Sequence, residues 1–279
     1  MSSPKALVTG SAGFVGRNLV KRLSNLGFDV RELDKSYLDS NKWEEILRNS
    51  LLEAEPDVVF HVGACSNTLS NDVQSVMESN YEATKIISDW SFTAKVPLIY
   101  SSSAANYGKD GRFPSNLYAW SKYVGEHYAV SRGAVALRYF NVYGPGEEDK
   151  GEMASFVFQA HQKNVLGLPV LLFPGNPTRD FVYIDDVVGA NIYAYQNVHD
   201  IRPGAYDVGS GTSSSFETML DFFSISYGYT GLESVPAGYQ FTTKSSQEKW
   251  LPGWRPQFSL AKGLTSYRAH LSLKGQGLR

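Results

Sequence analysis

The sequence predicts an α/β protein with a doubly wound parallel sheet and a smaller C-terminal substrate-binding part. Short apolar segments at residues 5–9, 28–33, 57–62 and 96–100 are typical of buried strands. Segments with helical spacing of apolar residues separate them, and this alternation is typical of a parallel sheet covered by helices. After residue 146 the pattern becomes irregular, which favours a second, smaller part.

Length, charge and cysteine content narrow the class of protein. The chain has 279 residues and a formal net charge of −2, which gives no reason to expect nucleic acid or a membrane surface as a partner. Cys65 is the only cysteine, so no internal disulfide can form and a reducing compartment fits. No apolar run approaches the roughly 18 residues of a membrane helix, and we expect no signal peptide, a cytoplasmic location and no metal site.

A glycine-rich loop follows the first predicted strand directly. It lies between that strand and a helix carrying Leu19, Leu23 and Leu26, and the next strand ends at Asp34. Glycines allow a tight turn, close approach of the backbone to a pyrophosphate and close packing of helix on strand. We therefore predict a Rossmann-type dinucleotide site, with cofactor contacts from Gly10, Ser11, Gly13, Phe14, Val15 and Gly16.

The residues after the second strand bear on the choice of cofactor. Asp34 is placed to accept hydrogen bonds from the adenosine ribose, which favours NAD. Lys35 beside it is suited to a 2′-phosphate, which favours NADP, although a solvated surface lysine explains it equally well.

Small residues follow the third strand, where a backbone could run beneath the cofactor. We assign Gly63, Ala64, Cys65 and Ser66 to the cofactor site, together with Asn80 in the following helix. The Asn80 amide either ties neighbouring strand ends together or is exposed. Cys65 is interpreted as a packing residue, and His61 as a core histidine rather than a catalyst.

Three polar residues predict the chemistry. Ser103 lies at the carboxyl end of a strand, and Tyr118 and Lys122 are four residues apart on the next helix, which places them on one face. We predict that Tyr118 transfers the proton of a substrate hydroxyl while hydride moves to the nicotinamide. Lys122 would hold the nicotinamide ribose and lower the pKa of Tyr118, and Ser103 would bind the reacting oxygen.

The second half is expected to hold the substrate. Arg179 has a guanidinium fork suited to a diphosphate, although an ion pair with a nearby carboxylate is the alternative. Residues 205–209 predict a strand that returns to the main sheet, and the tail with Trp250, Trp254 and Tyr267 would complete the substrate lobe. We assign residues 1–143 with 181–209 to the nucleotide-binding domain, and 144–180 with 210–279 to the substrate-binding domain.

These motifs resemble a known family nearly from end to end. The glycine loop and the Y-x-x-x-K pair are similar to the extended short-chain dehydrogenase/reductases. The segments 61–66, 138–145 and 150–155, together with Tyr239-Gln240, resemble the H-E-G-A-C-S, R-Y-F-N-V-Y-G-P, K-G-S-M-A-S and R-Y-Q motifs of the ADP-L-glycero-D-manno-heptose 6-epimerases.

The resemblance implies a nucleotide-sugar epimerase that oxidises its substrate to a transient ketone and returns hydride, using tightly bound NADP, with NAD as the alternative. It implies that Tyr118 and Lys150 are the two acid/base groups and that Val142 and Lys150 also contact the cofactor. Without it, Lys150 would be interpreted as a surface lysine. It further implies substrate contacts from Ser103, Asn141, Phe173, Gly175, Asn176, Arg179 and Tyr239. A homo-oligomer is expected.

The chain departs from the family pattern where the sugar would lie. These positions are Val62, Gly146, Asp149, Glu152, Gln159 and Gly238, and the region between Asp34 and Asp57 is shortened. A 4-epimerase or reductase of other nucleotide sugars therefore remains an alternative, as does a non-catalytic NAD(P)-binding protein. The segment Ala104-Ala105-Asn106 lacks the Asp-Glu pair of a 4,6-dehydratase.

Overall fold

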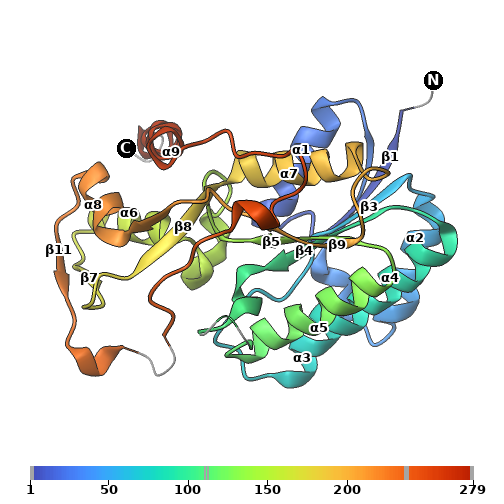
Figure 1. The fold of residues 1–279 in the computed structure, drawn as a ribbon, viewed down its shortest axis with the longest axis horizontal. Coiled ribbons are helices and arrows are strands. Elements are labelled where there is room, and N and C mark those ends of the chain that lie inside the picture. The colour runs from blue at the N-terminus through green and yellow to red at the C-terminus, as the bar shows by residue number, and fades with distance from the viewer. Residues whose placement is uncertain (1–2, 110, 112, 236–238, 277–279) are drawn as a thin grey trace.

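A six-stranded parallel sheet forms the centre of the computed structural model, which describes residues 3–109, 111, 113–235 and 239–276. The strand order is β2-β1-β3-β4-β5-β9, and every neighbouring pair is parallel (Figure 1). The strands are β1 (Lys5–Thr9), β2 (Asp29–Leu33), β3 (Val58–His61), β4 (Leu98–Ser103), β5 (Val135–Tyr139) and β9 (Gly204–Val208). The predicted return strand is thus confirmed as β9.

Helices cover both faces of this sheet, as a doubly wound fold requires. Two of them, α1 (Phe14–Asn25) and α7 (Ile184–Gln196), pack together on one face. The opposite face carries α2 (Trp43–Ala54), α3 (Val73–Met77), the π-helical turn η2 (Glu78–Glu82), α4 (Ala83–Ala94) and α5 (Leu117–Ser131) (Figure 1). The predicted fold class is confirmed.

Alternating side chains of the strands pack into two separate hydrophobic clusters. Ala6 and Val8 of β1 point into the cluster beneath α1 and α7, whereas Leu7 between them points into the cluster beneath α2 and α4. This is the two-residue period of a strand that is buried on both faces. It explains why the strand segments are almost entirely apolar in the sequence.

The strand order reverses between β1 and β3, because β2 lies on one side of β1 and β3 on the other. Ligands of such sheets bind outside the carboxyl ends of the strands at this point. The turns after β1, β3 and β4 all meet there, and they carry the predicted cofactor residues and Ser103.

A smaller part lies at one end of the main sheet, on the left of Figure 1. A three-stranded sheet in the order β10-β8-β6 and a two-stranded sheet of β11 and β7 form its framework. Its elements are β6 (Asn141–Tyr143), α6 (Phe156–Val165), β7 (Val170–Leu172), β8 (Thr178–Tyr183), β10 (Ser213–Ser215), α8 (Phe216–Phe223), β11 (Tyr227–Tyr229) and α9 (Leu260–Gln276). The division at residue 143 stays a prediction.

Short 3-10 helical turns lie between these helices and strands: η1 (Lys35–Asp39), η3 (Ala104–Tyr107), η4 (Glu148–Met153), η5 (Leu232–Ser234) and η6 (Gln247–Lys249). Between β2 and β3 the chain forms η1 and α2 alone, which accounts for the shortened region seen in the sequence. No helix among the described residues has the length and apolar character needed to cross a membrane.

The aromatic residues of the C-terminal tail also pack against the main sheet. Trp250 forms a bridge with Asp207 of β9, and Trp250, Trp254 and Tyr267 all belong to the core cluster beneath α1 and α7. The expectation that these aromatic residues finish the smaller part was therefore incomplete, because long-range packing brings the tail back to the main sheet.

Candidate active site

The glycine loop has the geometry that a dinucleotide needs. Gly10 has a φ of +64°, and a Cβ atom on it would lie 2.5 Å from the Cα of Gly63. A Cβ on Gly16 would collide with the carbonyl of Gly10. The turns after β1 and β3 thus pass each other at backbone contact, and side chains larger than hydrogen are excluded there.

The amino end of α1 is open to an anion. Its N-cap is Gly13, no side chain caps its N–H groups, and no acidic residue occupies its first turn. Uncapped N–H groups together with the helix dipole attract phosphate. The residues of this loop therefore fit the pyrophosphate of a nicotinamide dinucleotide.

Two other predicted cofactor positions border the same loop. Asp34 is half-buried directly after β2, whose Leu33 carbonyl accepts a hydrogen bond from the Gly10 amide at 2.7 Å. Lys35 is exposed. The pair is therefore placed beside the glycine loop, where an adenosine ribose would lie.

Asn80 ties the turn after β3 to a helix, and its predicted contact with a cofactor stays a prediction. Its side chain has no exposure to solvent, and its amide bonds both backbone groups of Cys65 at 2.6 and 3.0 Å and the Ser121 hydroxyl at 2.8 Å. Asn80 therefore anchors the turn after β3 to α5, which favours the first of the two interpretations of its amide. Ala64 and Ser66 are exposed in that turn, and Cys65 is half-buried.

Ser103 and Tyr118 meet at the carboxyl edge of the sheet. Asn116 caps α5 by accepting from the Ala119 amide at 2.8 Å, which places Tyr118 in the first turn of the helix. Burial raises the pKa of Tyr118, and a hydrogen bond with the Ser103 side chain partly offsets this. The predicted pair of a serine and a phenol is thus assembled.

Lys122, one turn after Tyr118 in α5, is almost completely buried, and its lowering of the pKa of Tyr118 stays a prediction. Its side chain is 2 % exposed, and its ammonium lies 4.3 Å from the centre of the Tyr100 ring. Burial lowers the pKa of Lys122 to about 7, against the opposing charge of Glu126. The hydrogen bond with the Ser103 side chain lowers the pKa of Tyr118 and so favours its phenolate.

His61 is a core histidine, as predicted. Its ring nitrogens lie 2.7 Å from the Thr9 hydroxyl and 2.8 Å from the Thr84 hydroxyl. Burial and the charge of Lys122 lower its pKa to about 3. A ring that stays neutral and has both nitrogens occupied joins β3 to β1 and α4, and is not placed to transfer a substrate proton.

Lys150 is not a solvated surface lysine. Its ammonium lies 5.2 Å from the centre of the Phe14 ring, beside the glycine loop, and burial lowers its pKa against the charge of Glu147. Asp149 next to it pairs with Arg17 of α1 at 2.9 Å. The turn η4 therefore holds Lys150 beside the glycine loop, and the half-buried Val142 packs against the adjoining core.

Arg179 and Tyr239, predicted as substrate contacts, lie together with Phe173. The Arg179 guanidinium lies 5.0 Å from the centre of the Tyr239 ring, and Phe173 and Tyr239 meet edge to face at 5.1 Å. Arg179 is 9 % exposed, donates to the carbonyls of Thr178 and Phe241, and also interacts with the Tyr239 hydroxyl. It forms no ion pair within the described part of the chain, so the carboxylate alternative finds no support.

The other predicted substrate contacts are Gly175, Asn176 and Asn141. Gly175 has a φ of +95°, and a Cβ on it would meet the Phe241 ring at 2.9 Å. Asn176 is exposed in a left-handed conformation with a φ of 50°. Asn141 is exposed and accepts from the Thr243 hydroxyl at 3.2 Å.

The positions that depart from the family pattern differ in their burial and in their contacts. Val62 packs against the core, Glu152 is exposed, and the Gln159 amide donates to the carbonyls of Glu152 and Ala154. Gly146 has a φ of +99° beside α1. Gly238 lies outside the described residues.

Sequence reasoning missed three residues that shape the site. Phe241 brings its ring to Gly175 and its carbonyl to Arg179. Glu147 is fully buried and accepts from Ser155 and from the Tyr267 hydroxyl at 2.9 Å, which fixes the loop of Lys150. Glu126 is buried one turn beyond Lys122. The signal for Glu126 was its four-residue spacing from Lys122, whereas nothing local marks the other two.

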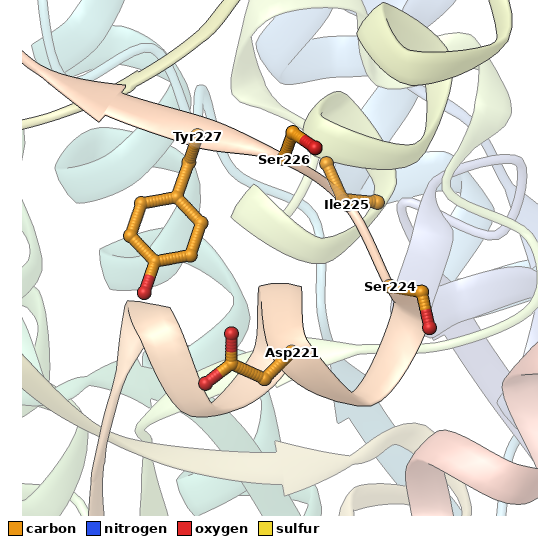
Figure 2. A pocket seen from close by; sticks show the side chains of 5 residues that line it. All are labelled: Asp221, Ser224, Ile225, Ser226 and Tyr227. Atoms are coloured by element: carbon orange, nitrogen blue, oxygen red, sulfur yellow. The ribbon is translucent and has the colours of Figure 1, made fainter.

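A surface hollow of about 430 Å³ lies away from these residues, between the end of α8 and β11. Asp221, Ser224, Ile225, Ser226 and Tyr227 line it (Figure 2). None of the predicted site residues contributes to it, so the hollow is separate from the candidate active site.

Comparisons with known proteins decide the family. The profile of the NAD dependent epimerase/dehydratase family matches residues 6–209. The chain belongs to this family. Within the NAD dependent epimerase/dehydratase family, the ADP-L-glycero-D-manno-heptose-6-epimerase of Brachyspira hyodysenteriae is 35% identical over 266 residues, which cover 82% of this chain and 83% of that protein.

Solved structures agree with this NAD dependent epimerase/dehydratase fold. The Helicobacter pylori ADP-L-glycero-D-manno-heptose-6-epimerase matches with a TM-score of 0.82 and 26% identity, covering 97% of each chain. The Thermus thermophilus UDP-glucose 4-epimerase in complex with NAD matches with a TM-score of 0.79 and 25% identity, covering 96% of this chain and 98% of that one. The predicted resemblance and enzyme class are confirmed.

Proposed function

We propose that the protein is a nucleotide-sugar epimerase that inverts one carbinol carbon through a transient ketone, with an ADP-heptose as the first candidate substrate. The contact of Ser103 with Tyr118, one helical turn from Lys122, carries the proposal. A hydroxyl bound by Ser103 and Tyr118 would sit at the carboxyl edge of the sheet, beside the place where the glycine loop receives a nicotinamide dinucleotide.

The cofactor supplies the redox step, taking hydride from the carbinol carbon and returning it to the ketone. Gly10, Gly13 and the amino end of α1 would hold its pyrophosphate, and Asp34 with Lys35 would meet the adenosine ribose. The resemblance favours NADP, which Lys35 suits, whereas Asp34 suits NAD.

The pKa values of Tyr118 and Lys150 are shifted in opposite directions, which supports their roles in the proton transfers. Burial raises the pKa of Tyr118, so the phenol keeps its proton and can donate it to the ketone oxygen. Burial lowers the pKa of Lys150, so the amine accepts a proton more readily at neutral pH. Inversion needs hydride returned to the other face of the ketone, which therefore presents its oxygen to each group in turn.

Arg179 supports a diphosphate in the substrate. A guanidinium that is almost fully buried without a carboxylate partner carries an unbalanced charge, and a phosphate would balance it through paired hydrogen bonds. The rings of Phe173, Tyr239 and Phe241 beside it offer apolar faces to a base or sugar. A 4-epimerase or reductase of another nucleotide sugar shares these features, and the positions that depart from the family pattern would select the sugar.

Mass spectrometry of the native protein, followed by a panel of ADP-, GDP- and UDP-sugars, tests this proposal. We expect a nicotinamide dinucleotide to be retained through purification, because an epimerase regenerates its cofactor, and at least one nucleotide sugar to be converted into its epimer. Conversion with stoichiometric consumption of added NAD(P)H would identify a reductase. Retained cofactor with no turnover of any sugar would favour the non-catalytic alternative.

A further inference from the structure

One buried carboxylate joins the catalytic helix to the segment that carries the catalytic serine. Glu126 of α5 is 1 % exposed. Its Oε2 accepts from the Ser102 hydroxyl at 2.6 Å, the Asn106 amide at 3.1 Å and Nε of Arg138 at 2.8 Å. Its Oε1 accepts from Nη2 of Arg138 at 2.6 Å. The carboxylate therefore connects α5 with the end of β4, with η3 and with β5.

These contacts enclose Ser103 on both sides. Ser102 comes directly before it in β4, and Asn106 lies in η3, which begins directly after it. Ser103 caps η3 by accepting from the Ala105 amide at 3.1 Å, and it also hydrogen-bonds Tyr118. Because Tyr118 and Glu126 lie on one rigid helix, the Glu126 contacts determine where Ser103 stands relative to the phenol.

We propose that Glu126 is a positioning residue, which with Arg138 holds Ser103 at its working distance from Tyr118. The inference rests on the proposed function. Glu126 does not touch the reacting atoms; it acts through Ser102, Asn106 and Arg138.

Arg138 extends the same restraint across the sheet. Its Nη1 donates to the Tyr107 hydroxyl at 2.8 Å, and that hydroxyl donates to Asp207 of β9 at 2.7 Å. Asp207 in turn accepts from the Ser246 amide at 3.1 Å. Tyr107 is the last residue of η3, so the serine segment is restrained at both of its ends by one connected network.

Stability of the fold alone does not require the ion pair between Glu126 and Arg138. Removing two buried charges from water is costly, and apolar residues of similar size often stabilise a fold equally well. What an apolar pair cannot supply is the set of directional hydrogen bonds to Ser102 and Asn106. A double variant that replaces both charges therefore separates positioning from stability.

Glu126 has a second effect, on Lys122. Its charge raises the pKa of Lys122, which burial lowers to about 7. The other titratable groups that face Lys122 are His61 of β3, Tyr100 of β4 and Tyr118 of α5. Of these, His61 is held neutral by its lowered pKa, and Tyr100 by a pKa that burial raises, so Glu126 is the nearby negative charge.

The test compares Glu126→Met/Arg138→Met with the wild-type protein, using a nucleotide sugar that the wild type converts. We expect the double variant to unfold at a temperature close to that of the wild type and to retain its cofactor. We expect kcat to fall by about a hundredfold with little change in KM, since a small misplacement of a catalytic group has effects of that size. The decline of activity at alkaline pH should begin at lower pH, because Lys122 loses its proton more easily.

The matched control is Asp89→Asn/Arg132→Met, which removes an exposed ion pair of 2.8 Å where α5 ends against α4. It should leave kcat and the pH profile unchanged. A folded Glu126→Met/Arg138→Met protein with wild-type kcat would overturn the positioning role. If the double variant is unstable, Glu126→Asp replaces it: an unaltered kcat there would also overturn the proposal, because a carboxylate shortened by one carbon cannot keep the same contacts. A wild-type protein without turnover would instead contradict the proposed function.

Discussion

A Tyr118→Phe protein should lose about a thousandfold in kcat for epimerisation, because general acid–base groups contribute about 10² to 10⁴. The substitution removes the only atom of Tyr118 that can carry the transferred proton. It also removes one hydrogen bond, to Ser103, which costs the fold about 1 kcal/mol. The cofactor should remain bound, because the glycine loop is untouched. An assay of nucleotide-sugar turnover checks the loss of kcat. Mass spectrometry checks that the cofactor remains bound.

Tyr123→Phe is the control on the same helix. Tyr123 is half-buried and meets His127 and Trp120 edge to face, with ring centres 4.3 and 5.7 Å away. Its loss of a hydroxyl should leave kcat unchanged. If Tyr118→Phe and Tyr123→Phe proteins turn over equally well, Tyr118 is not the proton-transfer group.

A Lys150→Ala protein should lose most of its interconversion of the two epimers. In the two-base scheme each epimer presents its hydroxyl to a different group, so one epimer still reacts through Tyr118 while the other has lost its partner. We expect single-turnover reactions to form the keto-sugar from one epimer only, as measured by mass spectrometry after quenching. The expected loss of interconversion is about a hundredfold or more.

Lys163→Ala is the matched control, because Lys163 is an exposed lysine of α6. It should behave as the wild type. Normal epimerisation by the Lys150→Ala protein would show that Tyr118 alone serves both faces of the ketone, and the two-base assignment would then be wrong.

Local signals predicted the parts of the site that depend on short-range geometry. The loop from Gly10 to Gly16 follows a strand and opens a helix, and its glycines are required because their Cβ atoms would strike neighbouring backbone. The spacing of Tyr118 and Lys122 likewise fixes one helical face. Such relations are decided within one turn or one strand end, so the sequence alone reveals them.

Burial and distant partners could not be predicted in the same way. The pKa of Tyr118 depends on how deeply α5 packs and on Ser103, and the burial of Lys122 depends on Tyr100. Asn80 bonds Ser121, which is 41 residues away in the chain. The position of Trp250 against Asp207 likewise results from packing between segments that no local pattern connects.

In the proposed reaction, hydride leaves one carbon of the sugar and returns to that same carbon. The most direct test uses a nucleotide sugar that carries deuterium at the carbon to be inverted, with the reaction followed by NMR and mass spectrometry. We expect the epimer to keep its deuterium at that carbon, because the bound cofactor would carry the label between the two steps. Replacement of the label by solvent hydrogen would contradict it, since a proton would then have been removed from carbon and hydride transfer would not be the route.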